Sequence, residues 1–173
     1  MAITDSLSAT FYAKIDADLT RAQSYGGFAG KDSIDVNKTQ SFTDGSDSQQ
    51  ATGWFSSQFT ATTDGITISL ADSADPLGTA GDDVPTSDPE GKKLRALFII
   101  NEDTTNYIEL ENGTNALADM LTGTSAKIRI GPRGFLAISI PDGYSAMNDG
   151  SDDELKITAN TSSCSVKITY MFG

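Results

Sequence analysis

Residues 164–172 read Cys-Ser-Val-Lys-Ile-Thr-Tyr-Met-Phe, and from Cys164 to Phe172 every second residue is apolar. Successive side chains of a β-strand point to opposite faces of the sheet, so this pattern predicts a strand with one buried and one solvated face. The same alternation recurs through the chain, beginning at residues 7–15, and helical spacing is almost absent. The chain is therefore expected to be all-β.

Ten segments have this strand character: 7–15, 34–42, 54–62, 66–70, 92–100, 106–110, 127–130, 135–140, 154–159 and 164–172. One short helix is expected at 115–121, with Gly123 as its stop. About nine or ten short strands joined by turns predict an antiparallel β-sandwich, of Greek-key or jelly-roll type. A chain of 173 residues fits one such domain, 1–173.

Turn residues indicate how these strands are joined. Asp64-Gly65 separates strands 54–62 and 66–70 and is typical of a hairpin, and we expect a second hairpin across residues 160–163. Residues 131–134, Gly-Pro-Arg-Gly, predict another tight turn. Segment 92–100 is the most apolar, so it is expected at the centre of a sheet.

Two connections lack strand character. Residues 21–31 predict a flexible connection with Tyr25 and Phe28 as aromatic anchors. Residues 72–91 contain three prolines and many acidic residues, and they predict a long acidic loop. This loop is expected to project from the domain or to order only on a partner.

The charge distribution bears on the partner. The net charge of −12 argues against a nucleic acid, because phosphate binding requires a basic footprint. Basic residues that follow the acidic region form a hypothetical docking patch for an acidic partner: Lys92, Lys93, Arg95, Lys127, Arg129 and Arg133. The alternative is that these residues are ordinary surface charge.

The residue types exclude most catalytic chemistry. The chain has no histidine, which removes Ser-His-Asp and Cys-His catalysis and most zinc sites. Cys164, the one cysteine, is expected to be a small buried hydrophobe. We therefore expect no enzyme activity, no catalytic residue and no cofactor.

Two carboxylates could act as a glycosidase pair, because that chemistry needs no histidine. Glu109 with Glu111, and the acidic residues 152–154, are instead expected to be solvated charge. Trp54 and Phe55 are expected to fill the core rather than line a sugar groove.

Two oxygen-rich turns, 44–47 and 148–153, are the candidates for calcium. Neither has the glycine and glutamate positions of an EF-hand loop. Turns stabilised by their own Asp and Asn side chains are the favoured interpretation, so no metal is expected.

Residues 1–5 lack the basic and apolar regions of a signal peptide, and no run of eighteen apolar residues occurs. Synthesis in a cytoplasm, without secretion and without a membrane partner, is the expectation from these features.

From Leu94 onward the chain resembles small virion structural proteins of tailed bacteriophages. The resemblance lies in segments 94–101, 106–110, 128–134 and 155–170: a strand ending in asparagine, a short strand, an Ile-x-Ile-Gly-Pro-x-Gly turn and a terminal hairpin. It is closest in style to the β-sandwich capsid decoration, or cement, proteins.

This resemblance implies a non-enzymatic protein that binds and stabilises the assembled phage head. Its partners would be the major capsid protein or other virion proteins, and it would form a homo-oligomer, with a trimer favoured. Two alternatives stay open: a tail, head–tail connector or receptor-contacting virion protein, and a carbohydrate-binding or adhesive module.

Overall fold

The computed structural model of the chain describes residues 7–21, 30–78, 85–117, 120–121 and 125–173. These residues form strands and no helix, which confirms the all-β class. Among them there is accordingly no helix long and apolar enough to cross a membrane. The strands are β1 (Ser8–Arg21), β2 (Gly30–Asp44), β3 (Gln50–Ala51), β4 (Gly53–Ala61), β5 (Ile66–Ser69), β6 (Leu94–Asn101), β7 (Ile108–Asn112), β8 (Lys127–Ile130), β9 (Phe135–Ser139), β10 (Glu154–Ala159) and β11 (Cys164–Phe172).

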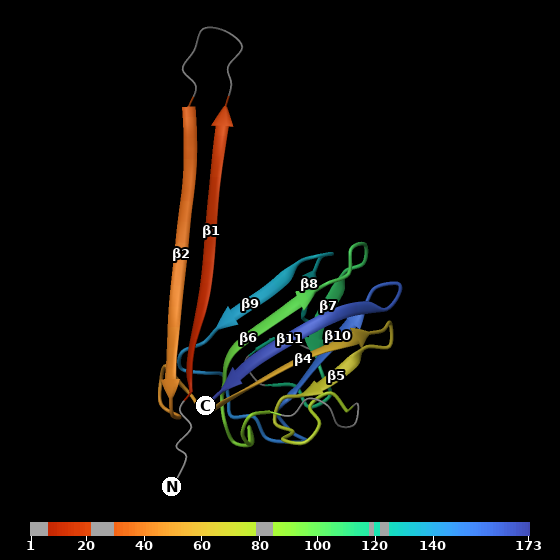
Figure 1. Cartoon of the computed structure of the whole chain (residues 1–173). Coiled ribbons are helices and arrows are strands. Elements are labelled where there is room, and N and C mark those ends of the chain that lie inside the picture. The colour runs from red at the N-terminus through yellow and green to blue at the C-terminus, as the bar shows by residue number, and fades with distance from the viewer. Residues whose placement is uncertain (1–6, 22–29, 79–84, 118–119, 122–124) are drawn as a thin grey trace.

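Two four-stranded antiparallel sheets form a sandwich (Figure 1). Sheet I has the order β4-β11-β6-β9, and sheet II has the order β5-β10-β7-β8. The pairs are nested along the chain: β4 with β11, β5 with β10, β6 with β9, and β7 with β8. This nesting is the topology of a jelly roll, so the sandwich expectation is confirmed and one of its two variants is selected.

The core lies between the inner faces of the two sheets. β11 alternates without a break, so that Cys164, Val166, Ile168, Tyr170 and Phe172 are all fully buried. The Tyr170 ring lies 5.1 Å from that of Phe55 on β4, and its hydroxyl donates a hydrogen bond to the Leu70 carbonyl. Burial of this phenol strongly raises the pKa of Tyr170, with smaller contributions from nearby carboxylates.

The expected hairpins at residues 63–65 and 160–163 are wrong. Both turns exist, but each leads from one sheet to the other, because β4 and β11 belong to sheet I and β5 and β10 to sheet II. Gly65 has φ of 83°, and its amide donates to the Thr62 carbonyl. A glycine at positive φ serves a crossing between sheets as well as it serves a hairpin.

β6 lies between β11 and β9, which confirms its expected central place in a sheet. Its pairing with β11 shifts near the end of the sandwich: Met171 lies opposite Ala96, but Phe172 lies opposite Leu94. Arg95 is the extra residue of this β-bulge. A bulge turns one side chain out of the regular alternation, and here it places an arginine among buried residues.

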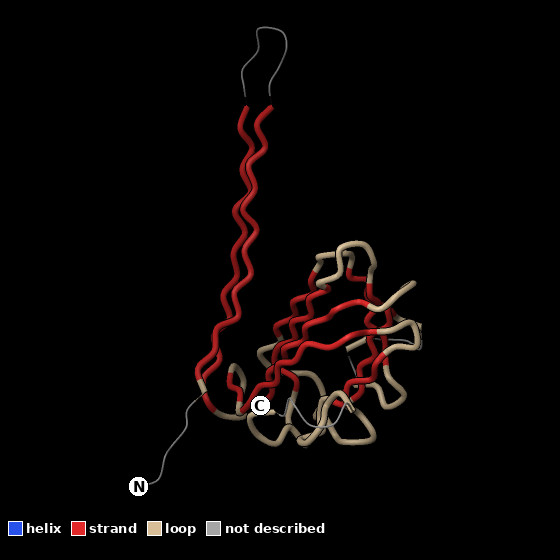
Figure 2. The backbone as a smooth tube through the Cα atoms, turned by 45° about the vertical axis from the view of Figure 1, so that its right-hand side comes forward, coloured by secondary structure: helices blue, strands red, loops and turns tan. Residues whose placement is uncertain are grey.

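β1 and β2 form a long hairpin arm that stands away from the sandwich (Figures 1 and 2). Their antiparallel ladder runs without a register shift from Ser8 opposite Thr43 to Arg21 opposite Gly30. Residues 21, 30 and 31 are therefore paired strand, which corrects the expected connection at 21–31. The predicted anchors Tyr25 and Phe28 lie outside the described residues.

The root of the arm is fixed to the outer face of sheet I. Phe42, Ala51 and Ala96 form a small buried cluster, and Leu7 and Met171 pack against it. β3 continues the arm's sheet by pairing with the last residues of β2.

Arg95 ties this root to two other segments through three backbone carbonyls. Its Nε donates to the carbonyl of Gly173 at 3.1 Å, Nη1 to that of Pro141 at 2.8 Å, and Nη2 to that of Ser46 at 2.7 Å. Burial lowers the pKa of Arg95, while the charges of Asp142 and Asp47 partly offset this effect. A guanidinium nevertheless stays charged at neutral pH.

Two further expectations are corrected. The described parts of 72–91 pack on the sandwich: Pro76, Leu77, Pro85 and Pro89 are buried, and Trp54 and Thr86 exchange hydrogen bonds along the edge of β4. Within the predicted helix 115–121, Ala116 instead forms a bridge with Glu154, and residues 118–119 lie outside the described residues.

We predict that Arg95→Met lowers the free energy of unfolding by about 3 kcal/mol or more, because three backbone carbonyls lose a charged donor whose side chain is buried. Urea denaturation followed by far-ultraviolet circular dichroism measures this change.

Arg129→Met is the matched control. The Arg129 side chain is 61% exposed in a surface ion pair, so its replacement is expected to cost less than about 1 kcal/mol. Equal losses in the two variants would contradict the structural role assigned to Arg95.

Candidate interaction surfaces

The outer face of sheet II is a ladder of alternating charges. Lys127 on β8 lies 2.8 Å from Glu111 and 3.2 Å from Glu109 on β7, and Arg129 lies 3.0 Å from Glu109. Lys156 on β10 approaches Glu111 from the other side at 3.9 Å. These paired groups leave the face with little net charge to offer a partner.

The ladder perturbs the titration of both glutamates. A hydrogen bond from Arg129 is the main cause that lowers the pKa of Glu109, and one from Lys127 does the same for Glu111. Hydrogen bonds to Glu111 and, second, to Glu109 raise the pKa of Lys127. Both carboxylates are therefore anionic at neutral pH, and neither is tuned to act as a general acid.

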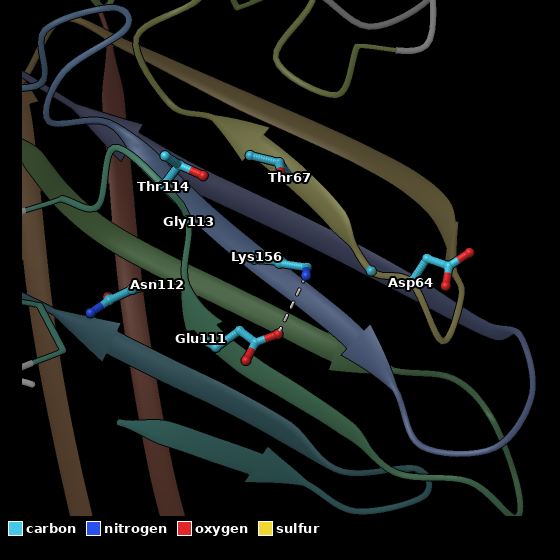
Figure 3. A pocket seen from close by; sticks show the side chains of 8 residues that line it. Asp64, Thr67, Glu111, Asn112, Gly113, Thr114 and Lys156 are labelled. Carbon is cyan, nitrogen blue, oxygen red and sulfur yellow. Dashed lines mark ion pairs between the residues drawn. The ribbon is translucent and has the colours of Figure 1, made fainter. Parts of the chain in front are cut away.

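A polar hollow of about 380 Å³ opens on this face, beside the ladder (Figure 3). Its lining comes from the β4–β5 turn, β5, β7 with the start of the following loop, and β10: Asp64, Gly65, Thr67, Glu111, Asn112, Gly113, Thr114 and Lys156. Figure 3 shows Lys156 and Glu111 pointing toward one another across neighbouring strands. The Lys156 ammonium and the Glu111 carboxylate in this hollow carry opposite charges that offset each other.

The structure divides the six residues of the hypothetical basic docking patch. Arg95 is 2% exposed and bound to carbonyls, so it cannot belong to a surface patch, which corrects that part of the prediction. Lys127 and Arg129 lie on sheet II, already paired with glutamates. Arg129 also lies 3.9 Å from the centre of the Tyr107 ring.

The three remaining residues of that patch are Lys92, Lys93 and Arg133. The two lysines precede β6, whereas Arg133 lies in the β8–β9 turn next to the opposite end of that strand. They therefore belong to two separate places on the surface, and only the pair of lysines lies near the root of the arm.

The outer face of sheet I has a different chemistry from that of sheet II. Phe98 and Ile100 of β6 lie there opposite Ala137 and Phe135 of β9. The rings of Phe98 and Phe135 are 5.7 Å apart, and Phe135 is 67% exposed. Exposed apolar clusters of this kind mark interaction sites.

Trp54 belongs to the same outer face rather than to the core. It is 43% exposed, whereas Phe55 beside it is buried. The expectation that both fill the core is thus wrong for Trp54, because neighbouring residues of a regular strand point to opposite faces. Strict alternation along β4 was the signal that could have separated them.

Cys164 is fully buried, as expected, and burial raises the pKa of its thiol. The two turns considered as candidates for calcium contain no group of three carboxylates, histidines or cysteines that could hold a metal, in the parts of the chain that the structure describes. At the second of these turns, the Asn148 carbonyl accepts hydrogen bonds from the amides of Ser151 and Asp152.

Asp153 is not the solvated charge that the sequence analysis predicts. It is fully buried beneath the end of sheet II, where Ser69 donates a hydrogen bond to its Oδ2 and its Oδ1 has no partner. Burial raises the pKa of Asp153, helped by the charges of Asp149 and Glu154 and opposed by the bonds from Ser69 and Ala71. The buried carboxyl group favours its neutral form.

Asp153→Asn is predicted to change the pH dependence of stability. Above the ordinary pKa of 3.8 the native state retains this proton longer than the unfolded chain, so wild-type stability falls as pH rises toward the raised pKa. The asparagine variant lacks this dependence. The difference in unfolding free energy, variant minus wild type, is therefore expected to increase with pH through that window in urea titrations.

Asp64→Asn is the control, since Asp64 is exposed and Asn-Gly supports the same turn. A difference for Asp153→Asn that stays constant with pH would contradict the raised pKa.

Comparison with known proteins identifies no relative: no family model, no curated protein and no solved structure matches the chain. Its function must therefore be inferred from its own residues and surfaces.

Proposed function

We propose that this protein is a non-enzymatic structural component of a virion, and that it decorates and stabilises the assembled capsid of a tailed bacteriophage. The observation that carries the proposal is the hairpin arm, which extends from a jelly-roll body that is complete without it. The resemblance of the chain from Leu94 onward to cement proteins supplies the context.

The arm supports a role in assembly because, beyond its root, it stands away from the rest of its own chain. A two-stranded ribbon is marginally stable in water by itself, and its stability increases when it packs on a further layer. At about 3.3 Å per residue, its fourteen paired positions span roughly 46 Å, enough to reach a neighbouring subunit.

The body supports the same role through its two unlike outer faces. The charged face of sheet II keeps the protein soluble, and the net charge of −12 disfavours random aggregation. The apolar face of sheet I, around Phe98 and Phe135, is suited to contact with another protein surface.

Rebinding to depleted particles tests the proposal. Particles from the source are dissociated mildly, stripped of this protein, and mixed with the purified chain. We expect saturable binding at a fixed ratio to the major shell protein, together with a higher particle melting temperature.

Particles that retain their own copies have no vacant sites and are the control. Binding at a few copies per particle would instead support a tail or connector position. Absence of rebinding would contradict the decoration role, and saturable binding to a glycan array would favour the carbohydrate-binding alternative.

A further inference from the structure

The register of the arm gives it one apolar face. Residues directly opposite in an antiparallel pair share a face, and successive pairs alternate between the two faces. By register, one face takes the β1 residues Ala9, Phe11, Ala13, Ile15, Ala17 and Leu19, opposite the β2 residues Phe42, Gln40, Lys38, Val36, Ile34 and Asp32. Pairs on the other face include Ser8 with Thr43, Thr10 with Ser41, and Tyr12 with Thr39. The first face, called the apolar face below, is therefore apolar along β1 and mixed along β2, whereas the second face is polar.

The root of the arm shows what this apolar face packs against. Leu7 and Phe42, at the root, pack with Ala96 and Met171 on the outer face of sheet I. Beyond that point the two surfaces separate, since the arm continues away from the sheet (Figure 2). On the outer face of sheet I beyond the root, Phe135 is exposed, and Phe98, Ile100 and Ala137 are half-buried.

The arm has no built-in means of closing on its own sheet. A ribbon bends sharply at bulges, and the ladder from Ser8 to Arg21 has no register shift. The root is also held by the bond from Arg95 to the Ser46 carbonyl. The apolar surfaces of arm and sheet within one chain are thus matched in chemistry but kept apart.

We propose that the arm of one copy packs its apolar face on the outer face of sheet I of a second copy. This contact would repeat, between two chains, the packing that Leu7 and Phe42 make at the root.

The distribution of charge favours this partner. The arm, residues 8–43, contains four basic and four acidic residues, so the net charge of −12 lies entirely outside it. Two bodies repel one another, whereas a neutral arm can approach an acidic body without that cost. The outer face of sheet II carries a ladder of paired charges, which does not match the apolar residues of the arm.

Disulfide trapping between two single variants tests the contact. Ala13→Cys lies on the apolar face of the arm by register, and Ala137→Cys lies beside Phe135 on sheet I. Cys164 is buried and contributes little background reaction. Mixed and mildly oxidised, the two purified full-length variants are expected to give a cross-linked heterodimer of the two chains.

Two comparisons make the result decisive. Tyr12→Cys, on the opposite face of the arm, and Thr67→Cys, exposed on sheet II, replace one partner each and are expected to reduce cross-linking at least about tenfold. Ala13→Cys and Ala137→Cys combined in one chain test closure of the arm on its own sheet. Cross-linking only within single chains, or equally with the control cysteines, would overturn the proposal.

A second measurement uses variants that preserve strand propensity. Ile15→Thr with Val36→Thr removes apolar surface from the arm, and Thr39→Val alters the opposite face by a comparable exchange. Sedimentation equilibrium should show that the concentration for half-association rises about tenfold or more for the double variant only. A monomeric wild type, or no difference between the variants, would overturn the proposal.

These experiments use the purified chain without capsids. Failure of arm exchange would therefore leave decoration of the capsid standing, and failure of capsid rebinding would leave arm exchange standing.

Discussion

The buried guanidinium of Arg95 constrains how the arm and the sandwich of this molecule are joined. Arg95 could not remain buried and charged without acceptors, and the acceptors it has come from three separate segments. The bulge in β6 creates the position, and the carbonyls of Ser46, Pro141 and Gly173 complete it. The arm root, the β9–β10 connection and the residue after β11 therefore share one fixed point. At the other end of β6, Asn101 likewise connects separate segments. Its side-chain amide donates to the carbonyls of Asn106, Ile130 and Gly131.

Alternation in the sequence predicted strands well and their partners poorly. It identifies β11 and β4 because a buried residue at every second position is a local property. It does not say which sheet a strand joins, so the turn at Asp64-Gly65 was predicted as a hairpin although it crosses between sheets. The same pattern in residues 7–15 predicted a sandwich strand, because alternation does not reveal what covers the apolar face.

The charged residues show a second limit of prediction from sequence. Lys127 and Arg129 were candidates for a partner, but their partners are Glu109 and Glu111, which only the register of β7 and β8 brings opposite them. Arginine is a residue type usually found at the surface. Arg95 is buried because of a register shift between β6 and β11 that no local sequence pattern predicts. The absence of histidine, by contrast, can be interpreted without a structure, because it excludes histidine-dependent catalysis irrespective of the fold.

The nested pairing of the jelly roll also orders events during synthesis. β4 pairs with β11, so sheet I can close only after Phe172, the partner of Gly53, has been synthesised. The ladder of β1 and β2 is local and can form as soon as residue 44 has left the ribosome. The apolar face of the ribbon is thus exposed while the body is still unfolded, a period in which partly made chains are prone to associate. The neutral arm is followed immediately by the acidic segment from Asp44 to Glu90, which contains no lysine or arginine and would keep nascent chains apart during this interval.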